Sequence, residues 1–298
     1  MSPHVQPPAR DGDRRPATTP PRRSPLRRYL ETRGVLGGHA SAHATTRLVT
    51  ADGTRLEGTY LPGPSSAPTA VLLLHGFAAN RRKPAYARLA DGLARDLPVL
   101  ALDLRGHGGS GGVSTFGDHE VADVDAGLAW LRALGHRHVV TVGLSMGGTA
   151  ALHAASLGAD TDAVVTVSAP GWFRDVPDTD ALRRLHAVWV RPSARLGLRV
   201  ALGVRLAGPE AWRSPPHPAE MVTQVRQPLL VVHGADDAYF PPSDADDLVA
   251  AAAGPATVWH EPIGFGHAED GISTEVVARL RHAIVTVATT GRFPTRDG

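Results

Sequence analysis

The sequence predicts a protein of the α/β class, in which a mainly parallel β-sheet is covered by helices on both faces. Short apolar runs alternate along the chain with longer segments of helical periodicity, which is the pattern of such a sheet. Several runs are apolar throughout, as expected for strands buried on both faces. With 298 residues, the chain is long enough to bury a large core.

Eight strands are expected. The first two are joined at Ala51-Asp52-Gly53, which is a hairpin signal. The later runs are short, apolar and rich in β-branched residues, as central parallel strands are. The predicted strands are Thr45–Thr50, Thr54–Leu61, Ala70–Leu74, Val99–Leu102, Val139–Leu144, Ala163–Val167, Leu229–Val232 and Thr257–His260.

Helices are expected between these strands, because the connections show apolar residues at helical spacing. In one of them, Val121, Val124 and Leu128 fall on a single helix face. Another begins at Pro84, which is tolerated in a first turn. The predicted helices are Pro84–Asp96, Asp118–Leu134, Met146–Leu157, Ser243–Ala253 and Thr274–Val287.

The domain organisation follows from where this alternation starts and stops. Residues 45–169 and 225–290 form the predicted core, and residues 170–224 are too long for a simple connection. That segment carries Trp172, Phe173 and helical spacing at Leu182–Val190, so we expect an inserted helical cap after the sixth strand. Residues 291–298 are expected to form a C-terminal tail.

Residues 1–44 are predicted to be a disordered basic tail, rich in proline and arginine. Residues 1–34 hold eight arginines and three acidic residues, whereas the remainder holds 23 basic and 26 acidic residues. A mildly acidic body argues against nucleic-acid binding. Arg22 and Arg23 are not followed by the apolar segment that an export signal needs, so a cytoplasmic protein is expected.

Composition excludes several other classes. The chain has no cysteine, which rules out disulfides, a thiolate nucleophile and cysteine metal sites. No uninterrupted apolar run approaches the length of a membrane span, so no stable membrane insertion is expected. The oligomeric state does not follow from the sequence.

A candidate nucleophile stands at Ser145, in Gly143-Leu144-Ser145-Met146-Gly147. This pentapeptide fits the G-x-S-x-G pattern and lies between a predicted strand and a predicted helix. Such a strand–turn–helix setting is what a nucleophile elbow requires, because the strained turn lifts the hydroxyl above the sheet.

A serine hydroxyl needs a base, and His267 is the best of 15 histidines. It follows the last predicted strand, which puts it at the same sheet edge as Ser145; His260 is its main rival. The imidazole in turn needs a carboxylate. Asp236 and Asp237 both follow the strand Leu229–Val232, and the pattern of residues leaves the choice between them open.

The negative oxygen of a tetrahedral intermediate needs fixed N–H donors. The backbone amide of Met146, directly after the nucleophile, is one candidate. The other is the amide of Phe77, in the loop that follows the strand Ala70–Leu74.

No cofactor or metal is expected. Residues 106–111 spell G-x-G-x-x-G, but loop-like residues follow where a dinucleotide site needs a helix. No H-E-x-x-H or comparable spacing of metal ligands occurs.

Taken together, these motifs resemble the α/β-hydrolase superfamily over residues 45–287. The resemblance rests on His75-Gly76-Phe77, on Asp103–Ser110, on the Ser145 elbow, and on His233–Asp237 with Gly266-His267. It implies that Asp237 is the acid, since the family's H-G-x-x-D pattern ends there. It also implies a cap after the sixth strand, and the hydrolysis of esters, lysophospholipids or monoglycerides, or the removal of amino-terminal residues from peptides.

The function expected is hydrolysis of a carboxylic ester or thioester through a Ser-His-Asp triad and an acyl-enzyme. The expected partner is a small-molecule substrate with an apolar acyl group. An aminopeptidase, which would need a carboxylate such as Glu210 or Glu220 near the pocket, is one alternative. Acyl transfer is another, and a non-catalytic binding protein on the same scaffold is the alternative of a different class.

Overall fold

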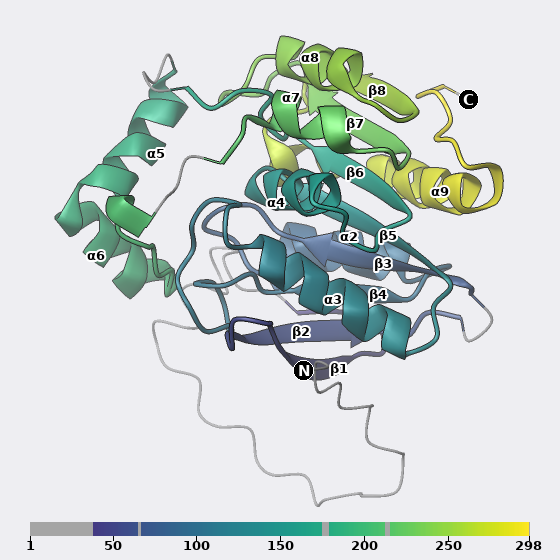
Figure 1. Ribbon diagram of the computed structural model, residues 1–298, viewed down its shortest axis with the longest axis horizontal. Coiled ribbons are helices and arrows are strands. Elements are labelled where there is room, and N and C mark those ends of the chain that lie inside the picture. The colour runs from purple at the N-terminus through teal and green to yellow at the C-terminus, as the bar shows by residue number, and fades with distance from the viewer. Residues whose placement is uncertain (1–37, 65–66, 175–178, 212–214, 298) are drawn as a thin grey trace, which may run out of the picture.

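A computed structural model describes residues 38–64, 67–174, 179–211 and 215–297. At its centre is an eight-stranded sheet in the order β1-β2-β4-β3-β5-β6-β7-β8 (Figure 1). The hairpin β1–β2 and the pair β2–β4 are antiparallel, and all other neighbours are parallel. The strands are β1 Ala44–Val49, β2 Arg55–Leu61, β3 Thr69–Leu74, β4 Val99–Leu102, β5 His138–Leu144, β6 Ala163–Val167, β7 Leu229–Gly234 and β8 Ala256–Glu261. The predicted fold class and mainly parallel sheet are confirmed.

The central strands are buried on both faces, which explains their continuous apolar sequence. Every residue of β3, β4, β6 and β7 is buried. Alternate residues of β3 join two different cores: Val71 and Leu73 pack in one, Leu72 and Leu74 in the other. The side chains therefore follow the strand period of two and attach helices to both faces.

Helices α2 (Pro84–Leu93) and α9 (Thr274–Thr290) supply the first core. Helices α3 (Val121–Ala133), α4 (Met146–Ser156) and α8 (Ser243–Ala251), with the short α7 (Pro218–Met221), supply the second. The α3 helix begins three residues later than predicted. The buried carboxylate of Glu120 accepts the N–H groups of Thr115 and Gly117, and these bonds hold the preceding residues in a turn.

The chain between β6 and β7 contains two further helices, α5 (Asp180–Val190) and α6 (Pro192–Leu202). The hydroxyl of Thr179 caps α5 by accepting the N–H of Leu182. The two helices lie side by side, outside the layers that cover the sheet (Figure 1). Helical spacing predicted α5 but not α6. The remaining short 3-10 turns are Pro209–Ala211, Val222–Gln224 and Ala268–Gly271.

Both ends of the described chain contact the core. Of the predicted N-terminal tail, residues 1–37 lie outside the described residues, while the N–H groups of Ala40 and Ser41 donate to Asp91 of α2. In the predicted C-terminal tail, Phe293 is buried, and the carbonyl of Pro294 accepts a hydrogen bond from Trp259 of β8. Among the described helices, none is both long and apolar enough to span a bilayer.

Candidate active site

Ser145 sits on a strained turn between β5 and α4. Its φ of 50° and ψ of −117° lie in a region that side chains rarely adopt. The turn is possible because strand and helix approach closely through glycine. A Cβ on Gly143 would lie 2.2 Å from the carbonyl oxygen of Gly147, and one on Gly147 would lie 2.7 Å from that of Leu74. The backbone therefore presents the hydroxyl at the carboxyl edge of the sheet.

His267 lies in the loop after β8, and its ring joins Ser145 to Asp237. Its Nε2 is 2.9 Å from Ser145 Oγ, and its Nδ1 is 2.8 Å from Asp237 Oδ2. Because an ionised carboxylate only accepts, Nδ1 carries the hydrogen and Nε2 is the acceptor for the serine proton. The structure thus brings the three predicted residues into one line of hydrogen bonds.

Asp237 is held as a carboxylate although its side chain is fully buried. Burial alone would raise its pKa, but hydrogen bonds from His267 and from the N–H groups of Phe240 and Tyr239 hold the pKa of Asp237 below its usual value. His233, the first residue of the H-G-x-x-D pattern, contacts the carbonyl of Phe240 through Nε2 and closes the same turn. The acid therefore remains charged at neutral pH.

The rival residues are engaged elsewhere. Asp236 is exposed and accepts the N–H of Gly264 at 2.7 Å, so it supports the loop of His267 without contacting the ring. His260 lies on β8 and pairs with Asp246 of α8 at 2.8 Å.

The loop after β3 lies directly against the elbow. A Cβ on Gly76 would be 3.3 Å from Ser145 Cβ, so this loop and the start of α4 face the same space. The N–H groups of Phe77 and Met146 have no hydrogen-bond partner among the described residues. Two unused donors on either side of a nucleophile can serve a developing oxyanion.

Two neutral histidines fix this loop. His75 Nε2 accepts the N–H of Leu104 at 3.0 Å, and burial lowers the pKa of His75 to about 4. His107 Nε2 lies 3.3 Å from the N–H of Ala78 and acts as its acceptor. Burial lowers the pKa of His107 to about 3, so both rings are uncharged at neutral pH.

Sequence reasoning missed the group that ties this loop to the histidine loop. The N–H of Gly76 donates to Tyr86 Oη at 2.8 Å, and Tyr86 Oη donates to Glu269 at 2.6 Å. The other oxygen of Glu269 pairs with Lys83. Glu269 is two residues beyond His267. No sequence motif predicts this link, because Tyr86 and Glu269 lie 183 residues apart. In the sequence, Tyr86 is indistinguishable from an ordinary core residue of α2.

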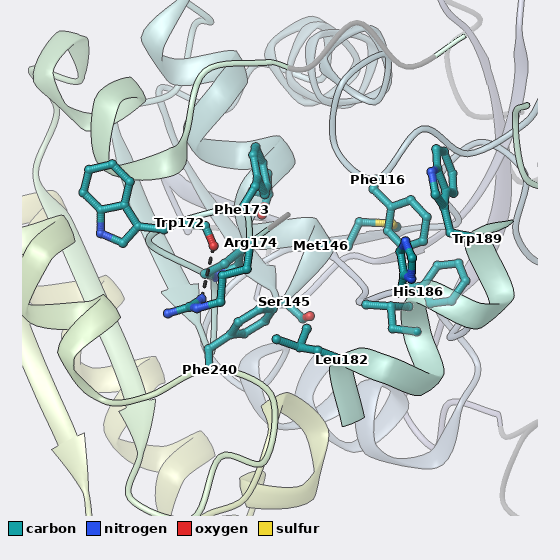
Figure 2. A pocket seen from close by; sticks show the side chains of 14 residues that line it. Phe116, Ser145, Met146, Trp172, Phe173, Arg174, Leu182, His186, Trp189 and Phe240 are labelled. Carbon is teal, nitrogen blue, oxygen red and sulfur yellow. Dashed lines mark hydrogen bonds between the residues drawn. The ribbon is translucent and has the colours of Figure 1, made fainter. Parts of the chain in front are cut away.

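Ser145 lines a cavity of about 320 Å³. In Figure 2, Leu182 of α5 and Phe240 lie beside Ser145, and Phe116 and Trp189 lie together on one side of it. The rings of Phe116 and Trp189 are 4.9 Å apart, and those of Phe77 and Phe116 are 4.5 Å apart. The residues that α5 contributes fall at one helical face: Leu182, Leu185, His186 and Trp189.

Charge is nearly absent from the cavity wall. No carboxylate is among the described residues that line it. Arg174 reaches it but pairs with Asp244 at 2.6 Å. Glu210 is exposed, and Glu220 accepts the N–H of His217 in a capping box. The described lining therefore suits an apolar group better than the amino group of a peptide.

Comparison with known proteins shows which family and which solved structures this architecture resembles. The family described as having the alpha/beta hydrolase fold matches residues 69–208. The chain has the α/β-hydrolase fold. Asp237 and His267 lie beyond the matched range, so their assignment rests on the geometry of the site.

Solved structures with this fold include two esterases. The esterase Pf2001 of Pyrococcus furiosus is 20% identical, with a TM-score of 0.63, over 83% of this chain and 93% of that one. The esterase RhEst1 of a Rhodococcus species is 21% identical, with a TM-score of 0.60, over 81% and 98%. A hydrolase of Pseudomonas aeruginosa is 20% identical, with a TM-score of 0.60, over 83% and 98%.

A sequence relative is the protein of Bacillus subtilis (strain 168) named "Uncharacterized protein YqkD". It is 28% identical over 209 residues, which cover 67% of this chain and 65% of the relative. The chain therefore matches somewhat less than two thirds of that protein's length.

Proposed function

We propose that this α/β-hydrolase is a serine esterase that cleaves a carboxylic ester or thioester through an acyl-enzyme. The observation that carries the proposal is the line of hydrogen bonds from Ser145 through His267 to Asp237, with Ser145 at the wall of an apolar cavity. The match to the alpha/beta hydrolase family model and fold neighbours that are esterases support it. A binding protein would have no need of an activated serine.

The geometry accounts for each step of the reaction. His267 Nε2 takes the hydroxyl proton as Ser145 Oγ attacks the acyl carbon, while the charged Asp237 stabilises the imidazolium. The amides of Met146 and Phe77 donate to the oxygen that becomes negative. His267 then gives its proton to the departing alcohol or thiol. Water attacks the acyl-serine by the same route, which releases the acid and restores the hydroxyl.

The cavity favours an apolar acyl group as the part of the substrate that is recognised. Its wall is built mostly from aromatic and aliphatic side chains, and the part contributed by α5 supports a role for this helix as a cap over Ser145. Because the described lining offers no carboxylate to hold a substrate amine, an ester fits this site better than the end of a peptide.

Labelling by a fluorophosphonate probe tests the proposal. We expect stoichiometric labelling of Ser145, together with turnover of p-nitrophenyl esters that varies with acyl length because the cavity is of limited volume. Folded wild-type protein that neither reacts with the probe nor hydrolyses any ester of the series would overturn it.

Tyr86 supplies a prediction about positioning. Tyr86→Phe leaves the N–H of Gly76 buried without its acceptor, which costs about 1–3 kcal/mol and loosens the loop of Phe77. We expect kcat to fall roughly tenfold with little change in KM, because the lost order affects the oxyanion donors most. Steady-state kinetics on a short ester measures both constants.

Tyr60→Phe is the matched control. The Tyr60 hydroxyl bonds His136 at 3.1 Å at the edge of the sheet, away from Ser145, and its removal should leave kcat unchanged. A Tyr86→Phe variant with a lower thermal midpoint but wild-type kcat would show that the link only stabilises the fold.

A further inference from the structure

Charge is distributed unevenly between the α5–α6 segment and the rest of the molecule. Residues 179–208 contain six arginines and one acidic residue, Asp180. The other residues from 35 onward contain 17 basic and 25 acidic residues. Residues 179–208 therefore carry a net charge of +5 and the other residues from 35 onward carry −8, and this asymmetry would orient the molecule in an electric field.

The same segment also exposes apolar surface, on the outer face of α6. We define this face by Ser193, Leu196, Gly197 and Val200. Leu196 is 62% exposed and Val200 is 67% exposed, and no residue of α6 is buried. A Cβ on Gly197 would meet nothing within 4 Å. The spacing of these four residues places them on one side of the helix.

Two exposed arginines belong to the same segment. Arg191 precedes α6 and Arg199 lies within it, and both are exposed. Val190, at the end of α5, is 46% exposed beside them. Arg195, by contrast, turns inward and donates to the carbonyls of Leu206 and Ala207. The α6 segment thus combines an exposed apolar face with two exposed arginines, one in the helix and one directly before it.

The positive charge of this segment indicates which kind of partner would cover this face. A second copy of α6, or the arginine-rich residues 1–34 of this chain, would bring like charge against it. An anionic bilayer offers negative headgroups to arginine and an apolar layer to leucine and valine at the same depth. We propose that the outer face of α6 docks this protein on an anionic lipid bilayer.

This contact is peripheral, and it would bring the cavity to the source of its substrate. The face of α5 that carries Leu182 and Trp189 lines the cavity, and α5 packs against α6. A docked α6 therefore places the cavity next to the lipid, where esters with long acyl chains reside. That last step, unlike docking itself, rests on the proposed esterase function.

Sedimentation with vesicles tests the docking on the full chain, without any measurement of turnover. We expect binding to vesicles that contain phosphatidylglycerol and about tenfold weaker binding when Leu196→Ser and Val200→Ser are combined, since each apolar side chain contributes to interfacial binding. Leu157→Ser with Val285→Ser, which changes exposed apolar residues on α9 and after α4, should bind like the wild type.

A charge-matched pair tests the arginines. Arg191→Gln with Arg199→Gln should weaken binding roughly 25-fold, at about fivefold per arginine. Arg88→Gln with Arg95→Gln removes the same charge from two exposed positions, one in α2 and one after it. Because these charges lie away from the contact, binding should weaken less than about twofold. All variants should keep the wild-type thermal midpoint.

Four results would overturn the proposal. They are absence of binding, equal binding to phosphatidylcholine vesicles, binding that both α6 pairs leave unchanged, and a dimer in solution that the Leu196→Ser, Val200→Ser pair dissociates. The third result would assign the contact to another part of the chain, such as residues 1–34. Loss of esterase activity with intact vesicle binding would count against the proposed function alone.

Discussion

Ser145→Ala is expected to lower kcat on a short ester by about 10⁴- to 10⁶-fold, the range found when a serine nucleophile of this type is removed. Within the described part of the chain, the hydroxyl of Ser145 makes no side-chain hydrogen bond other than that to His267 Nε2, and Ser145 lies at the cavity wall. Alanine at φ 50° meets the same backbone strain as serine, so the thermal midpoint should stay close to that of the wild type.

Ser156→Ala, at the other end of α4, is the matched control. Its hydroxyl bonds the carbonyl of His153 at 2.7 Å and faces away from the nucleophile. This variant should keep both its activity and its reaction with a fluorophosphonate. Substantial turnover by well-folded Ser145→Ala would move the nucleophile to another residue and would remove the basis of the proposed function.

Ser145 was predictable as the candidate nucleophile because its evidence is local. The strand before Ser145 and the helix after it are both visible as sequence patterns, and Gly143 and Gly147 stand where a Cβ would collide with backbone. His267 was predictable by a weaker argument, since residues after parallel strands meet at one sheet edge. The same argument holds for Asp237 and Asp236, so it could not separate them.

Geometry separates these two carboxylates because neighbouring residues in a turn point in different directions. Asp237 turns inward to accept from His267 and from the N–H of Tyr239, while Asp236 turns outward to Gly264. A single-residue difference of this kind depends on backbone torsions that no periodicity records.

Other features depend on long-range contacts and were not predictable. The Tyr86–Glu269 bond joins α2 to the loop after β8, and Phe116 and Trp189 meet across the cavity from separate segments. Helix α6 was not predicted, and none of its residues is buried. It packs against α5.

Asp237→Asn is expected to lower kcat by about 10⁴-fold, as the loss of the orienting carboxylate does in other serine hydrolases. An amide can donate to Nδ1 and so favour the tautomer with hydrogen on Nε2, which cannot take the serine proton. It also removes the charge that stabilises the imidazolium, a charge kept at neutral pH by the lowered pKa of Asp237. Kinetics between pH 6 and pH 9 would measure this loss.

Asp236→Asn tests the choice of acid with the same chemical change one residue away. Its side-chain oxygen can still accept the N–H of Gly264, so the loop of His267 should keep its place and kcat should fall less than about threefold. The contrast between the two variants isolates the contact with Nδ1, because both remove one negative charge from the same turn. A larger loss in Asp236→Asn would mean that the His267 loop swings toward Asp236 in the working enzyme, with Asp237 serving only to close its own turn.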